Sequence, residues 1–181
     1  MKRKIILNLA ISLDGYIASE DGGYDWIVGD GDDTLNNENK FNFDKFLEGI
    51  DIVVMGKNCY DQDMHNAYKN KKVYVATSQK IENQGNLHFI SGDIGKIIQE
   101  EKEKEGKDIY LFGGGGIVDS FIKADIVDEY IIAIIPIILG KGRPLFLENN
   151  PTIKLHLDEY YIENGITTLK YTKRKTEGSC I

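Results

Sequence analysis

The sequence predicts a three-layer α/β domain, with a mostly parallel central sheet between two helical layers and an antiparallel C-terminal hairpin. Three observations support this fold class. Short β-branched runs alternate with amphipathic helical segments, which is typical of parallel strands joined by crossovers. The 181 residues are enough for one domain with a sizeable core. Asn164-Gly165 separates two strand-like segments near the end, and Asn-Gly is a strong hairpin signal.

The predicted elements follow one another with short connections. Strands are expected in the apolar runs at 4–10, 51–56, 72–78, 86–90, 108–112 and 127–139, and in the two halves of 153–175. Helices are expected at 32–48, 92–106 and 116–125. Pro136 must end or kink its apolar strand, or place that strand at a sheet edge. Residues 1–173 are expected to form the single domain, and 174–181 a loose tail.

Composition and charge exclude several classes of protein. The net charge of −7, from 22 basic and 29 acidic residues without a basic stripe, argues against a nucleic-acid surface. No segment approaches the ~20 apolar residues of a membrane span. The first apolar run is interrupted at Asn8 and closed by Asp14, so it predicts a strand rather than a signal peptide. Cys59 and Cys180 lie far apart, which favours reduced thiols in a cytoplasmic protein without a metal site.

The stretch "DIYLFGGGGIVDSFI" places four glycines, residues 113–116, between a predicted strand and a predicted helix. Bare N–H groups at the positive end of a helix bind anions, and phosphates above all. Side chains at 113–116 would fill the space that phosphates need. The alternative is a close helix–strand crossing that requires small residues.

Two common glycine motifs do not match this loop. The phosphate loop of nucleotide triphosphatases needs a Lys-Ser/Thr pair after its glycines, and none follows. In the Rossmann motif the third glycine would fall at Val118 or Asp119, and Ala133 stands where the acidic residue belongs.

Two further strand ends carry polar or positively charged residues. Gly56 and Lys57 follow one predicted strand, and Thr77 and Ser78, with Lys80 nearby, follow the next. Ligands of open parallel sheets bind beyond the carboxyl ends of the strands. Together the three ends indicate a site for an elongated anion with several phosphates. Taken singly, Lys57 is equally explained as a solvated lysine and Ser78 as a turn residue.

At this point the motifs resemble a known family. "SLDGYIA", Trp26, "VVMGKNCY", "VATSQK", "LFGGGGIVDSF" and "PIILGKGRPLF" follow one another as in the dihydrofolate reductase-like fold. The most similar branch is the C-terminal reductase domain of bacterial RibD and its stand-alone relatives. The resemblance covers residues 4–172.

The resemblance implies an NADPH-binding reductase. Ala18 and Trp26 would lie by the nicotinamide, while Gly56, Lys57 and Cys59 match a helix start that receives phosphates. Lys57 and Ser78 would bind the 2′-phosphate, and the hydroxyl of Thr77 at the same strand end is a further candidate for cofactor binding. The segment from Gly114 to Ser120 would wrap the pyrophosphate. Together with the residue just before this segment, the cofactor-binding candidates here are Gly113, Gly114, Gly115, Gly116, Ile117 and Val118.

The substrate half departs from the family pattern. Dihydrofolate reductases carry a carboxylate about five residues after the Trp, which makes Asp30 and Asp32 candidate catalytic residues, unless they are ordinary solvated acids. Phe112 stands where RibD reductases bind substrate with Glu, and the phosphate-gripping segment is replaced by "YDQDMHNAYKN". Tyr24, Asp63 and Phe112 are the substrate candidates, and the histidines at 65, 88 and 156 are interpreted as structural or exposed.

The expected function is an NADPH-dependent reductase that transfers hydride to a small heterocyclic or imine/carbonyl substrate. It resembles the 5-amino-6-(5-phosphoribosylamino)uracil reductase of riboflavin biosynthesis. The alternatives are a dihydrofolate or pterin reductase and a non-catalytic NADPH-binding sensor. Family relatives pair as homodimers through their C-terminal strands, and the apolar run at 131–139 suits such an interface or, equally, a central strand.

Overall fold

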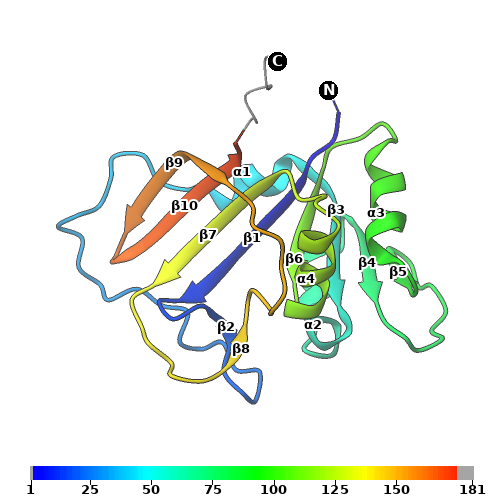
Figure 1. Ribbon diagram of the computed structural model, residues 1–181, viewed down its shortest axis with the longest axis horizontal. Helices are drawn as coiled ribbons and strands as arrows, with labels where there is room; N and C mark the ends of the chain where they lie inside the picture. The colour runs from blue at the N-terminus through cyan, green and yellow to red at the C-terminus, as the bar shows by residue number, and fades with distance from the viewer. Residues whose placement is uncertain (1, 175–181) are drawn as a thin grey trace.

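Eight strands form the central sheet of the computed structural model, which describes residues 2–174 (Figure 1). Their order across the sheet is β5-β4-β3-β6-β1-β7-β10-β9. The bounds in chain order are β1 Ile5–Ser12, β3 Ile50–Gly56, β4 Lys72–Ala76, β5 Leu87–Ile90, β6 Asp108–Gly113, β7 Glu129–Ile135, β9 Leu155–Glu163 and β10 Ile166–Lys173. All eight strands were predicted, with boundaries that differ by a few residues.

The sheet is parallel from β5 to β7 and antiparallel only at the hairpin. β1 pairs in parallel with both β6 and β7, whereas β10 runs antiparallel to β7 and β9. Asn164 and Gly165 have φ angles of 52° and 77°, the positive values that a two-residue hairpin turn requires. The predicted mostly parallel sheet with an antiparallel C-terminal hairpin is therefore confirmed.

Helices cover both faces of the sheet and create two separate cores. Ile5 and Leu7 of β1 pack with helices α3 (Ile94–Lys102) and α4 (Gly115–Lys123). Ile6, on the opposite face, packs in the core covered by α1 (Phe43–Glu48), α2 (Lys57–Asp61) and the 3₁₀ helix η1 (Met64–Tyr68). This alternation follows from the two-residue period of a strand whose two faces are both buried.

A second sheet of two short strands was not predicted. β2 (Tyr16–Ala18) pairs with β8 (Arg143–Pro144), and Ala18 lies opposite Arg143. A Cβ atom at Gly142 would lie 2.4 Å from the carbonyl oxygen of Ala18, so only glycine permits this approach. The pairing brings the "GKGRPLF" segment against the end of the "SLDGYIA" segment.

The helix predicted over 32–48 is wrong for residues 32–42. Within the range 32–48, only α1 is helical. The side chain of Asn42 caps it by accepting a hydrogen bond from Lys45 N at 2.8 Å. Upstream, the side-chain oxygens of Asn36 and Asn37 accept hydrogen bonds from the backbone of the β9–β10 hairpin. Asparagine side chains compete in this way with helix formation, and here tertiary partners decide the outcome.

Pro136 ends β7, which lies between β1 and β10 as an inner strand. Residues 131–135 of this apolar run thus form part of a central strand, one of the two alternatives given for it. At the C-terminus, Arg174 N donates to Lys154 O at 2.9 Å, so Arg174 still belongs to the domain. The rest of the predicted tail, with Cys180, lies outside the described residues.

Candidate functional site

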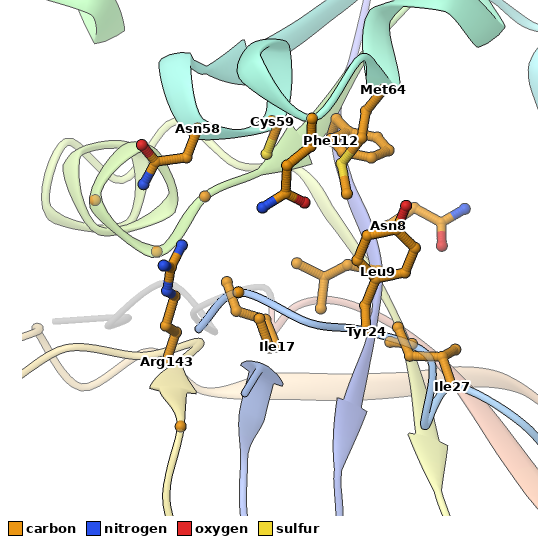
Figure 2. A pocket seen from close by; sticks show the side chains of 18 of the residues that line it. Asn8, Leu9, Ile17, Tyr24, Ile27, Asn58, Cys59, Met64, Phe112 and Arg143 are labelled. Atoms are coloured by element: carbon orange, nitrogen blue, oxygen red, sulfur yellow. The ribbon is translucent and has the colours of Figure 1, made fainter. Parts of the chain in front are cut away.

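A cavity of about 720 Å³ opens beside β1 and β6, between the loop that follows β2 and the start of α4. Its walls come from Asn8, Leu9 and Ala10 of β1, from Phe112 at the end of β6, and from α2, η1, β2 and β8. Figure 2 shows two unlike ends of this cavity. We call them the cationic end, around Arg143 and the glycines, and the apolar end, around Leu9 and Phe112.

The cationic end is built on the first turn of α4. Gly114 caps this helix with a φ of 97°, and its carbonyl accepts from Ile117 N and Val118 N at 2.9 and 3.1 Å. The N–H groups of Gly115 and Gly116, the first two helical residues, have no acceptor within the helix. They therefore offer two donors at the positive end of a helix that borders the cavity.

Arg143 and Asn58 complete the cationic end, and both side chains point toward the glycine loop (Figure 2). Within residues 2–174, the one hydrogen bond of the guanidinium is a 3.5 Å contact from Nη2 to Glu20 O. Most of its N–H donors are thus available to a ligand. A guanidinium binds phosphate oxygens through a fixed fork of donors, so this end is suited to a diphosphate.

The apolar end has walls of aliphatic, aromatic and thioether side chains. Leu9, Ile27, Met64 and Phe112 surround it, and the half-exposed Tyr24 reaches over it (Figure 2). Apolar walls with aromatic side chains of this kind accept a planar ring.

Seven of the predicted site residues line the cavity. They come from β2, the loop after it, α2, β6 and α4, and comprise Ala18, Tyr24, Cys59, Phe112, Gly114, Gly115 and Gly116. The Sγ of Cys59 lies 3.9 Å from Gly113 O, and burial raises the pKa of its thiol. The structure thus brings together residues that the sequence separates by almost 100 positions.

A second group of predicted residues lies outside the cavity, along the neighbouring strand ends. A Cβ on Gly114 would lie 3.9 Å from the backbone of Gly56, and Gly56 pairs with Ala76 just before Thr77 and Ser78. The strand order therefore forms a track from the glycine loop across Gly56 to Ser78. An elongated nucleotide would need such a continuous track.

Lys57 lies on this track but is already paired. Its Nζ forms an ion pair with Asp61 one turn later on α2 and lies 5.5 Å from the ring centroid of Tyr60. Thr77 is also engaged, since its hydroxyl accepts from Gln79 N at 3.1 Å. A phosphate at this end would compete with Asp61 for the lysine.

Other predicted residues have structural roles away from the cavity. Trp26 is 9% exposed and donates from Nε1 to Gly23 O at 3.2 Å, which holds the loop after β2. Val118 is a correction: its side chain is fully buried in the core, and its N–H is bonded to Gly114. The N–H of Ile117 is bonded to Gly114 as well, and Gly113 belongs to β6.

The acidic candidates do not face the cavity. Asp30 Oδ1 accepts from Asp32 N, and Asp32 Oδ1 accepts from Thr34 N, each at 2.9 Å. These bonds stabilise turns, and the bond to Thr34 lowers the pKa of Asp32. Asp63 is exposed in a left-handed conformation at the start of η1. The structure places all three carboxylates outside the cavity lining.

Sequence reasoning missed Asn8, Asn58 and Arg143. Arg143 lies inside the quoted segment "PIILGKGRPLF", but only the β2–β8 pairing shows that it meets the glycine loop. In the sequence, Asn8 stands out only as the residue that interrupts an apolar run. Its position in such a run was the available signal, because polar residues in buried strands need a partner.

Within residues 2–174, no cluster of three or more His, Cys, Asp or Glu side chains could hold a metal ion. No helix there has both the length and the apolar character that crossing a membrane requires.

Comparisons with known proteins place the chain in a family. The "Uncharacterized protein YwjB" of Bacillus subtilis (strain 168) is 35% identical over 162 residues, covering 87% of this chain and 90% of that protein. The crystal structure of a "Putative riboflavin biosynthesis protein" from Shewanella sp. PV-4 is 28% identical, with a TM-score of 0.78 and coverage of 95% and 99%.

A dihydrofolate reductase from Enterococcus faecalis, complexed with NADP(H), has the same fold at 15% identity, with a TM-score of 0.65 and coverage of 97% and 99%. The fold is therefore dihydrofolate reductase-like. The family model described as "RibD C-terminal domain" matches residues 3–168, nearly the whole chain. The chain belongs to the RibD C-terminal domain family.

Proposed function

We propose that the protein is a reductase that binds NADPH and transfers hydride to a small heterocyclic or imine/carbonyl acceptor. The observation that carries this proposal is one cavity with two unlike ends: Gly115, Gly116 and Arg143 at the cationic end, and apolar, partly aromatic walls at the other. A reduced nicotinamide dinucleotide has the matching parts, an anionic diphosphate and a flat ring.

The glycine loop fits this cofactor. A Cβ on Gly116 would meet no atom within 4 Å, so the helix start is bare on its cavity side. NADPH supplies the hydride when it is bound; the chain's residues bind it, orient the ring beside the acceptor and exclude water. The NADP(H) complex of the Enterococcus reductase, which shares the fold, supports the choice of cofactor.

The proposal is tested by following NADPH absorbance with the purified protein and a panel of pyrimidines, pterins, imines and aldehydes. Oxidation that depends on one acceptor class would support a reductase. Tight NADPH binding without oxidation by any member would instead favour the sensor alternative, and absence of NADPH binding would contradict both.

The pterin reductase alternative gains no support from the lining. Dihydrofolate reductases bond the pterin ring with a carboxylate, and the cavity lining contains no Asp or Glu within the described chain. The substrate named for a Thermotoga maritima protein of the same fold, 5-amino-6-(5-phosphoribosylamino)uracil, carries a phosphate. Arg143 is the one cation of the lining found in residues 2–174, and the proposal assigns it to the cofactor.

Lys57→Ala is expected to weaken NADPH binding by roughly tenfold and to leave NADH binding unchanged. One charge-assisted bond to the 2′-phosphate is worth about 1.5–3 kcal/mol, and the competing Asp61 pair favours the lower end. Asp61→Asn is the matched variant, and by releasing Lys57 it should tighten NADPH binding. Calorimetric titration gives the dissociation constants of NADPH and NADH for the wild type and both variants. Equal losses of affinity for the two nucleotides in Lys57→Ala would show that Lys57 does not bind the 2′-phosphate.

The rate is expected to vary little with pH between about 6.5 and about 8.5. Burial raises the pKa values of Cys59, Tyr68 and Tyr110 in the lining, so these groups stay protonated over this range. No carboxylate or imidazole from residues 2–174 lines the cavity to act as an acid or base. A kcat/KM profile with a clear ionisation in this window would reveal a catalytic group elsewhere.

We also propose that the protein forms homodimers through its C-terminal hairpin. β9 is an edge strand, and its Leu157 and Tyr160 are 44% and 55% exposed. Burial of these side chains against a second copy would stabilise a dimer. Light scattering should then give twice the chain mass for the native protein and less for Tyr160→Glu.

A further inference from the structure

Asn8 is an enclosed polar side chain on the wall of the apolar end. It is 7% exposed, pairs with Ile131 of β7 in the sheet register, and lines the cavity. Its Nδ2 has no hydrogen-bond partner among the residues that the structure describes. Native proteins rarely bury an amide donor without a partner, so an unpaired amide in a side chain that lines a cavity indicates a ligand group.

Within residues 2–174, the apolar end offers no opposite charge to an ionised ligand. In the described part of the lining, no Asp, Glu, Lys or His occurs, and the guanidinium of Arg143 lies at the cationic end, away from Asn8 (Figure 2). A carboxylate, phosphate or ammonium beside Leu9 and Phe112 would lose its hydration without gaining an opposite charge. The surroundings of Asn8 therefore favour uncharged ligands.

We propose that Asn8 is the specificity-determining residue of the apolar end, and that it selects an uncharged, planar, unphosphorylated ring with adjacent carbonyl and N–H groups. An asparagine amide carries one acceptor and two donors, and rotation about its terminal torsion angle presents either atom to the cavity. It can thus pair with both groups of an amide-type edge. This inference rests on the proposed function, because Arg143 must be occupied by the cofactor's diphosphate.

The test compares matched neutral and charged probes. Uracil is paired with orotate, its carboxylate, and uridine with uridine monophosphate, its phosphate ester. Each probe is titrated into the protein saturated with NADP⁺, and dissociation constants are measured for the wild type, Asn8→Leu and Asn8→Ala. Asn58→Leu is the control, because Asn58 is an asparagine of the same cavity at the cationic end.

We expect each neutral probe to bind the wild type at least ~10-fold more tightly than its charged partner. Both Asn8 substitutions should weaken uracil binding by about tenfold, which corresponds to the loss of one hydrogen bond of moderate strength. They should leave the affinity for NADP⁺ unchanged. Asn58→Leu should weaken NADP⁺ binding and leave uracil binding unchanged. Thermal unfolding of each variant confirms that the domain is folded.

Three results would overturn this inference: equal binding of neutral and charged probes, wild-type uracil affinity in the folded Asn8 variants, or binding of no neutral probe at all. Each of them can occur while NADP⁺ still binds. Failure of the proposed function is seen separately, because NADP⁺ and NADPH would then not bind when they are titrated into the wild-type protein.

Discussion

Gly116→Leu is expected to weaken NADPH binding by at least ~100-fold, while the domain stays folded. An added Cβ at Gly116 meets no atom within 4 Å, so the free protein has room for a side chain there. The same side chain would occupy the space beside the first α4 amides, where the diphosphate is proposed to lie. A hundredfold loss corresponds to about 2.7 kcal/mol, and calorimetric titration of NADPH measures it.

Gly116→Ala is the matched control, since it adds one methyl group at a helical position and alanine has a higher helix propensity than glycine. Its thermal unfolding should match or exceed that of the wild type. Gly114 and Gly115 are less informative positions. Gly114 has a φ of 97°, and a Cβ on Gly115 would lie 2.9 Å from Pro144 O, so substitutions would distort the loop itself. Retained NADPH affinity in folded Gly116→Leu would mean that the diphosphate does not lie beside the first α4 amides.

Arg143→Met is expected to weaken NADPH and NADH equally, by roughly 10- to 100-fold. Both nucleotides carry the diphosphate, and charge-assisted bonds to it are worth about 1.5–3 kcal/mol. Methionine keeps part of the aliphatic stem, so the change removes the charge with little loss of packing. The dissociation constants of both nucleotides provide the measurement.

Arg143→Lys is the informative companion because it keeps the charge and loses the planar fork of donors. Its affinity should fall between those of the wild type and Arg143→Met. A loss confined to NADPH would place the guanidinium at the 2′-phosphate instead, and unchanged affinity for both nucleotides would remove Arg143 from the site.

Much of the fold was predictable because it depends on local pattern. The β-branched run that became β3 and the apolar run that became β7 can be buried only as inner strands, and Asn164-Gly165 fixes its own turn. Residues 32–42 were not predictable, because Asn36 and Asn37 bond to a hairpin more than 120 positions away. No sequence window contains that information.

Part of the candidate site was likewise predictable from the sequence, and part was not. The bare start of α4 was predictable, since four glycines between a strand and a helix have a direct physical meaning. Arg143 was not, because a two-residue strand pairing with Ala18 places it at the cavity. Asp30 and Asp32 were candidates because the family resemblance implies a carboxylate about five residues after the Trp, and their turn hydrogen bonds explain them without catalysis.

The central claim is that the free N–H groups of Gly115 and Gly116 bind the diphosphate of a nicotinamide dinucleotide. The most direct measurement is the NMR spectrum of protein with isotope-labelled glycine, recorded as NADP⁺ is added. We predict that the Gly115 and Gly116 amide signals shift most, while Gly106, which lies against Arg3 and Asp51, stays unchanged. Saturable NADP⁺ binding that leaves the Gly115 and Gly116 signals in place would contradict the account.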